Sequence, residues 1–160
     1  MMVSSESTAA NHRPVRVMPP VYLLLAIVAM IALHFLLPGA ILLESPWRWI
    51  GVGILLAGLA LGFSAVRLFS KYHTTIKPGE QSSHLMTDGP YRITRNPIYV
   101  GMTLLLAGVA TMLGSATPWL VLPAFVWVIA RNVIPVEEAM MSQAFAAQYD
   151  AYRSRVRRWI

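Results

Sequence analysis

Two short polar segments, separated by two apolar runs, carry the side chains in this sequence that could do chemistry. The first segment, Asp88–Gly101, reads D-G-P-Y-R-I-T-R-N-P-I-Y-V-G and places arginines, an asparagine and tyrosines directly before an apolar run. The second begins at Glu137-Glu138 and ends in a cluster of arginines. Strongly polar side chains next to membrane-type segments are costly unless they have partners, so they indicate a functional site. The first segment supplies mainly hydrogen-bond donors and the second supplies carboxylates.

The acidic pair also has a simpler structural interpretation. Acids in the first turn of a helix complement its dipole. Neighbouring helical residues point about 100° apart, so Glu137 and Glu138 cannot share one role. Glu138 lies on a stripe that is most simply explained by packing on the bundle or the membrane surface, and this stripe comprises Met141, Phe145, Tyr149 and Tyr152.

Composition places these segments in a membrane protein. The 160 residues are 56% hydrophobic and 12% charged, with a mean hydropathy of +0.56. A soluble domain carries about 25% charged residues, so this chain lacks the polar surface of a soluble globule. The chain has no cysteine, which excludes disulfides, thiolate metal sites and a cysteine nucleophile. Nothing in the sequence suggests a metal site. We also expect no nucleic-acid partner, because the net charge of +6 is better explained by membrane topology.

Four apolar runs must position the polar segments. They are Val21–Leu37 (continuing past Pro38-Gly39 to Leu43), Trp49–Phe69, Ile98–Leu113 and Trp119–Ile134. A helix needs roughly 20 residues to cross a bilayer, so the first run suffices only if its helix continues through Pro38-Gly39. The last two runs predict a tight helical hairpin. The sequence therefore predicts an all-α, polytopic membrane bundle of about four transmembrane helices and a cytoplasmic, amphipathic C-terminal helix.

The distribution of basic residues predicts orientation. Apart from Arg48, the lysines and arginines lie at the N-terminus, in the central loop and towards the C-terminal end. The positive-inside rule then places both termini and the central loop in the cytoplasm, in what we expect to be a bacterial inner membrane. Residues 1–16 are expected to be disordered. Residues 17–160 are expected to form one domain, with its cofactor-binding part at about 71–160.

Structural roles are the favoured interpretation for the glycines and the histidine within the apolar runs. Gly51 and Gly53 lack the strand–turn–helix context of a dinucleotide loop. Gly58 and Gly62 form a small-xxx-small pair typical of close helix packing. His34 has no second titratable residue nearby in sequence, so packing or an interfacial position is the favoured interpretation.

The order of the polar motifs resembles a known family. The motifs are Gly89-Pro90-Tyr91, Arg95-Asn96-Pro97-Ile98-Tyr99-Val100-Gly101, Glu137-Glu138, the aromatic stripe and Arg158-Trp159. Over roughly Phe69–Trp159 the chain resembles the membrane-embedded methyltransferases that include isoprenylcysteine carboxyl methyltransferase and phosphatidylethanolamine N-methyltransferase. Asn96 stands where the eukaryotic isoprenylcysteine enzymes have histidine. Ala146 replaces a glycine, a change that we expect to matter little within a helix.

The resemblance implies S-adenosylmethionine as methyl donor, in a cytoplasm-facing pocket between the last two spans, the preceding loop and the C-terminal helix. A glutamate suits the cofactor's ammonium or hydroxyls, and neutral or basic donors suit its carboxylate and adenine. The cofactor contacts implied are His84, Leu85, Met86, Tyr91, Arg95, Asn96, Pro97, Tyr99, Glu137 and Glu138.

Two residues are candidates for direct action on the acceptor. Glu138 could assist the deprotonation of an amine. Arg131 could hold an anionic acceptor, although an anchoring role at the membrane edge is equally compatible with its position. The acceptor is expected to be a lipophilic molecule drawn from the bilayer, either an isoprenylcysteine-type carboxylate, a phospholipid-type amine or another amphiphile.

Two alternatives stay open. A relative of membrane sterol reductases would share a similar C-terminal half but bind NADPH, which needs more basic contacts for its phosphates. A non-catalytic membrane scaffold or transporter subunit would bind neither small molecule. The sequence does not indicate an oligomeric state.

Overall fold

The computed structural model describes residues 18–72 and 84–160. The segment expected to be disordered, residues 1–16, and residues 73–83 of the central loop lie outside these ranges. The described chain is helical and contains no named strand. Its elements are α1 (Pro19–Leu36), η1 (Trp47–Trp49), α2 (Ile50–Lys71), η2 (Gly89–Arg92), α3 (Pro97–Leu113), η3 (Thr117–Leu120), α4 (Val121–Asn132) and α5 (Ile134–Arg155).

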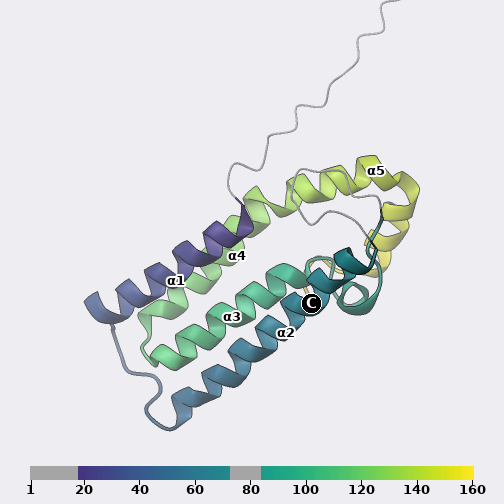
Figure 1. The fold of residues 1–160 in the computed structure, drawn as a ribbon. Coiled ribbons are helices and arrows are strands. Elements are labelled where there is room, and N and C mark those ends of the chain that lie inside the picture. Colours follow the sequence, from purple (N-terminus) through teal and green to yellow (C-terminus); the bar gives the residue numbers. More distant parts are fainter. Residues whose placement is uncertain (1–17, 73–83) are drawn as a thin grey trace, which may run out of the picture.

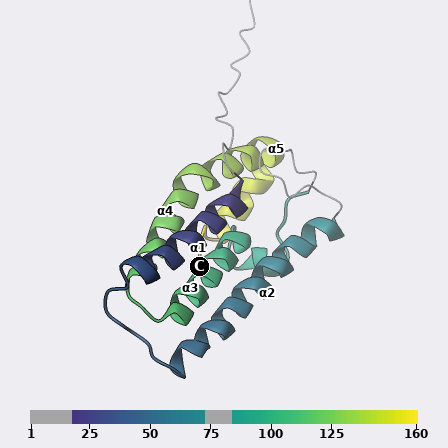
Figure 2. The ribbon, with the colours of Figure 1, turned by 60° about the vertical axis from the view of Figure 1, so that its left-hand side comes forward.

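Helices α1 to α4 lie side by side, and α5 extends beyond one end of this bundle (Figure 1). Helix α3 is central, because it packs against α2 on one flank and against α1 and α4 on the other (Figure 2). The core between α1, α3 and α4 is formed by apolar side chains that include Met30, Leu106, Phe125 and Ile129. The predicted membrane helix bundle is confirmed.

Three helical stretches are long and apolar enough to cross a membrane, namely Pro19–Leu36, Trp47–Lys71 and Thr117–Arg155, while α3 is a shorter apolar helix. The last stretch has 39 residues. At about 1.5 Å per residue it would exceed a hydrocarbon core about 30 Å thick, so part of α5 must lie outside the apolar layer. This agrees with the polar sequence of α5.

Helix α1 ends at Leu36 rather than continuing through Pro38-Gly39. Proline lacks a backbone donor and disfavours helical geometry in the preceding residue, which explains why the helix stops here. The following loop pairs with the α3–α4 connection, since Leu42 donates its backbone N–H to the Gly114 carbonyl at 2.8 Å. The first span therefore has 18 residues.

Glycines set the contact between α2 and α3. A Cβ atom added to Gly58 would lie 2.6 Å from the Gly101 carbonyl oxygen, and one added to Gly51 would lie 2.5 Å from the Gly108 carbonyl oxygen. The two backbones therefore touch at points seven residues apart on each helix. The predicted packing role of Gly58 is confirmed, and Gly51 has a packing role as well.

Helix α5 bends sharply at Ala146, which has φ 42° and ψ −120° (Figure 1). An L-residue with a positive φ is strained, because its Cβ crowds the backbone. The expectation that alanine in place of glycine matters little within a helix is therefore wrong, since this position is not helical. The bend directs the C-terminal half of α5 back towards the start of α3.

Candidate functional site

The turn before α3 is built by proline, glycine and a hydrogen bond between two tyrosines. Gly89 has a φ of +55°, which glycine adopts without strain and which lets the chain enter η2. Tyr91 in η2 is buried, and the Tyr152 hydroxyl donates a hydrogen bond of 2.7 Å to its carbonyl oxygen. Pro97 then opens α3 at a position where a missing N–H costs nothing. The turn is thus fixed against the second half of α5.

The two polar segments meet at Tyr99 and Glu137. Tyr99, in the first turn of α3, is only 5% exposed, and its hydroxyl donates a hydrogen bond of 2.6 Å to Glu137 Oε1 in α5. The short distance is typical of a hydroxyl bound to a carboxylate. The contact joins two residues that lie far apart in the sequence.

Glu138 faces a different set of partners, as expected for adjacent helical residues. Arg158 binds the Glu138 carboxylate through two of its nitrogens, with Nε 3.1 Å from Oε1 and Nη2 2.5 Å from Oε2. Arg95 Nη1 lies 3.3 Å from Oε1 as well, and the Arg95 and Glu138 side chains are only 11% and 15% exposed. Two guanidinium groups therefore share one carboxylate, which leaves one positive charge in excess.

Arg95 retains an unused donor. Its Nη1 donates a long hydrogen bond of 3.4 Å to the Tyr149 hydroxyl, whereas its Nε is buried and has no hydrogen-bond partner. A buried N–H without a partner is costly, so we expect an acceptor such as a water molecule or a ligand atom to satisfy it.

The C-terminal tail closes this cluster. The Arg95 backbone N–H donates to the Arg157 carbonyl oxygen at 2.9 Å. The Asn96 amide and the Thr94 hydroxyl both donate to the Arg158 carbonyl oxygen, at 2.9 and 3.0 Å. One donor of the buried Asn96 side-chain amide therefore holds the tail, and its second N–H and its carbonyl oxygen are not used in this contact.

Arg158 and Thr94 were not among the residues predicted for the site. The closing Arg158-Trp159 motif was a signal for Arg158, since it belongs to the pattern that the chain shares with the methyltransferases. No pattern in the sequence indicated Thr94, whose role depends on a contact between segments far apart in the chain.

The remaining predicted residues lie around the turn or away from it. The His84 ring stacks on the Tyr72 ring with centroids 4.3 Å apart, and Met86 packs in a small cluster with Ala65 and Tyr91. Leu85 is half-buried beside them. These residues adjoin η2 rather than the acidic pair.

Arg131 lies apart from the cluster. It is exposed near the end of α4, where its guanidinium lies 6.0 Å from the centre of the Trp127 ring. Among the interactions that the structure shows within the described residues, none joins Arg131 to Glu137 or Glu138.

Burial and hydrogen bonds shift the pKa values of groups in the turn and in the tail. Burial, and secondarily the charge of Glu137, raises the pKa of Tyr91 well above its ordinary value, so this phenol stays protonated. The hydrogen bond from Tyr72 to Asp88, and then the one from Arg92, lowers the pKa of the Asp88 carboxyl. The hydrogen bond to Glu138 raises the pKa of Arg158, which therefore stays cationic.

The donor set fits the amino-acid part of S-adenosylmethionine. Glu137 offers a carboxylate for an ammonium, and Arg95 offers an unpartnered, buried N–H for a carboxylate. Among the described residues, no group of three histidine, cysteine, aspartate or glutamate side chains could hold a metal ion.

The fold and this cluster define a helical membrane protein with a cluster of charged side chains where its bundle meets α5. The phospholipid methyltransferase family model matches residues 46–148, which is more than half of the chain. The chain belongs to this family.

Individual relatives agree with this membership. The chain is 30% identical to protein-S-isoprenylcysteine O-methyltransferase B of Arabidopsis thaliana, over 84% of this chain and 68% of the relative. It is 29% identical to protein-S-isoprenylcysteine O-methyltransferase of Schizosaccharomyces pombe, over 61% and 46%. It is also 28% identical to the nickel-cobalt-cadmium resistance protein NccN of Alcaligenes xylosoxydans xylosoxydans, over 70% and 53%. The chain thus spans about half to two-thirds of the length of these relatives.

Proposed function

We propose that the protein is an S-adenosylmethionine-dependent methyltransferase that acts on a lipophilic acceptor at the cytoplasmic face of the membrane. The observation that carries this proposal is the juxtaposition of Tyr99–Glu137 with the Arg95–Glu138–Arg158 cluster. One side of this arrangement is acidic and the other has excess positive charge. A zwitterionic amino-acid group is complementary to both.

Each residue then has a distinct task. Glu137, oriented by the Tyr99 hydroxyl, binds the cofactor's ammonium. Arg95 Nε donates to its carboxylate. Glu138 acts as a positioning residue, because its two oxygens hold the Arg95 and Arg158 guanidinium groups. When bound, the cofactor supplies a methyl group on a positively charged sulfur.

The chain contributes alignment and exclusion of water rather than covalent chemistry. Methyl transfer is an in-line displacement, so holding the reactants in line accounts for most of the rate. His84, Leu85 and Met86, together with the buried Tyr91, provide the apolar and stacking side of the site for the adenosine. Buried Pro97 fixes the start of α3 beneath it.

The names of the relatives and the local charge favour a carboxylate acceptor. Both plant and yeast relatives are named O-methyltransferases. Two guanidinium groups beside one carboxylate favour an anionic acceptor over a cationic amine. Arg131, exposed on α4, is in a position to guide the acceptor's anionic group from the lipid side.

Binding of S-adenosylhomocysteine to the purified protein in lipid nanodiscs tests the proposal. We expect Glu137→Gln to weaken binding by about tenfold or more and Tyr99→Phe by less, since one charge-assisted hydrogen bond is worth about 1.5–3 kcal/mol. Glu44→Gln is the matched control, because Glu44 lies in the loop between α1 and η1 at the far end of the bundle.

Three results would contradict the proposal. Binding of NADPH in place of S-adenosylhomocysteine would favour the reductase alternative. Binding of neither would favour a scaffold or transporter subunit. Equal binding by wild type and Glu137→Gln would remove Glu137 from the site.

A further inference from the structure

A cavity lies at the end of the bundle opposite to α5. It has a volume of about 190 Å³ and lies between the end of α1, η1 and the end of α3. Its lining residues are His34, Phe35, Arg48, Trp49, Met112 and Leu113. The proposed methyltransferase site uses none of these residues, so the cavity requires its own explanation.

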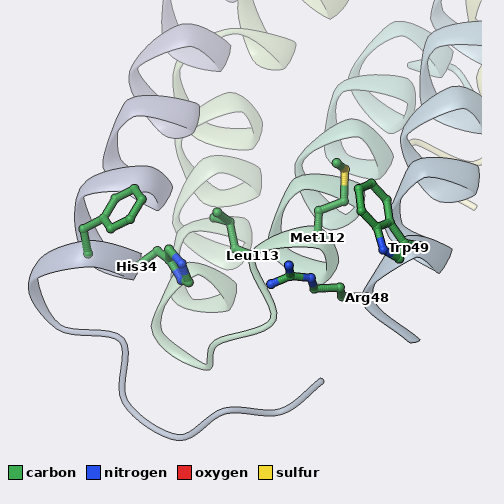
Figure 3. Close-up of a pocket in the computed structure, with 6 residues that line it drawn as sticks. His34, Arg48, Trp49, Met112 and Leu113 are labelled. Carbon is green, nitrogen blue, oxygen red and sulfur yellow. The ribbon is translucent and has the colours of Figure 1, made fainter. Parts of the chain in front are cut away.

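The cavity combines an apolar wall with a positive charge. Figure 3 shows the Arg48 guanidinium and the His34 ring pointing into the same space from opposite sides, with Leu113 between them. Within residues 18–72 and 84–160, the structure shows ion pairs for Arg92, Arg95 and Arg158 but none for Arg48. The guanidinium therefore has donors available for an anion.

The orientation of the His34 ring beside Arg48 is also fixed. Its Nδ1 lies 2.8 Å from the Oγ of Ser115, which is buried in the α3–α4 connection. That contact fixes the ring and leaves Nε2 for a second partner, whichever tautomer is present. The sequence predicted packing or an interfacial position for His34. The hydrogen bond to Ser115 fixes the orientation of the His34 ring.

The surroundings identify the anion as part of a membrane lipid. The side chains of Phe35, Leu36 and Ile50 beside the cavity are 75%, 77% and 57% exposed, as expected for residues that contact acyl chains. Trp47 and Trp49 are also exposed at this end, where tryptophan is typical of the membrane–water interface. A cation at this depth lies at the level of lipid phosphates.

We propose that this cavity binds the head group of an anionic phospholipid, with its phosphate on Arg48 and its acyl chain against Phe35. A lipid whose head group carries only negative charge is favoured, because an ammonium in the head group of a zwitterionic lipid competes with Arg48 for the phosphate. This site lies in the leaflet opposite to the proposed methyltransferase site and does not depend on that function.

Native mass spectrometry of the full chain, titrated with phosphatidylglycerol or phosphatidylcholine, tests this inference. We expect phosphatidylglycerol to bind more tightly to the wild type. We expect Arg48→Gln to weaken that binding about fivefold or more, which corresponds to the loss of one charge-assisted hydrogen bond exposed to solvent. Arg48→Lys keeps the charge and should retain most of the preference.

Arg67→Gln is the matched control, since Arg67 is also exposed and lies on α2 towards the other end of the bundle. Three outcomes would overturn the inference. They are equal binding of the two lipids, an equal loss on Arg67→Gln, and binding of soluble glycerol phosphate as tight as that of the lipid. Thermal unfolding without added lipid should be unchanged in Arg48→Gln, because Arg48 has no ion-pair partner among the described residues.

Discussion

Helices α2 and α3 meet through glycine backbones, whereas the second half of α5 and the tail meet the turn before α3 through charged and polar side chains. The first contact excludes every side chain larger than hydrogen at Gly58 and Gly101. The second depends on the pairing of charges around Glu138. The comparison shows a division of labour. The apolar interface fixes where α3 lies, and the polar one fixes the side chains around its first turn.

The largest expected effect on stability comes from replacing a glycine that contacts the backbone of the neighbouring helix. Gly58→Ala places a Cβ 2.6 Å from the Gly101 oxygen and 2.7 Å from the Leu105 nitrogen, both of which are backbone atoms that cannot move aside alone. We expect a loss of about 2–3 kcal/mol in the free energy of unfolding. Reversible unfolding of the protein in mixed micelles measures it.

Gly53→Ala is the control, because a Cβ there meets nothing within 4 Å. Alanine in a helix is about 1 kcal/mol better than glycine, so this variant should be equal to or more stable than wild type. Equal destabilisation by both substitutions would contradict the close contact of the two helices.

The second prediction concerns the charged interface. Glu138→Ala leaves Arg95 and Arg158 facing each other without a carboxylate, and we expect a loss of about 2 kcal/mol, below the range for a fully buried pair because Arg158 is partly exposed. A double-mutant cycle with Arg158→Ala should give a coupling energy of about 1 kcal/mol or more. Additive effects would show that the ion pair contributes nothing.

The third prediction is a gain in stability. Ala146→Gly removes the Cβ at a residue with a φ of 42°, so we expect stabilisation by about 1 kcal/mol. Ala147→Gly, one residue further along α5, should instead be destabilising, because glycine weakens a regular helix. If Ala146→Gly does not stabilise the protein, the bend at Ala146 is contradicted.

The smallest effect is a pH dependence in the turn. The hydrogen bonds from Tyr72 and Arg92 lower the pKa of Asp88, so its contribution to stability is present above the unfolded-state pKa of about 3.9 and is lost as the pH falls through the folded-state value. Asp88→Asn should therefore be less stable than wild type at neutral pH, with the difference disappearing in strong acid. A difference that persists at pH 2 would assign the effect to shape rather than charge.

The sequence was sufficient to predict the membrane bundle and the meeting of the two polar segments. Apolar runs carry the first part of that information locally, and the resemblance implied that the turn before α3 and the acidic pair line one pocket. The resemblance could not show which glutamate would contact Tyr99, since that depends on the rotation of α5 about its axis.

Three features depend on contacts between segments that are distant in the sequence. Pro38 ends α1 near Leu36, but the course of the loop that follows depends on the pairing between Leu42 and Gly114, which no local pattern shows. The bend at Ala146 contradicts the helix propensity of alanine, because contacts of Tyr149 and Tyr152 with the turn override it. Arg158 acquires its role only because that bend brings the tail back to Glu138.

Tyr99 and Gly101 lie within one turn of α3, so the residue that orients Glu137 is coupled rigidly to the residue that fixes α3 against α2. Helix α3 has 17 residues, whereas α2, against which it packs, has 22. A change in bilayer thickness that tilts α2 will therefore carry the first turn of α3 with it, because their backbones touch. We therefore expect lipid chain length to change the geometry of the charged cluster through the glycine contacts between α2 and α3.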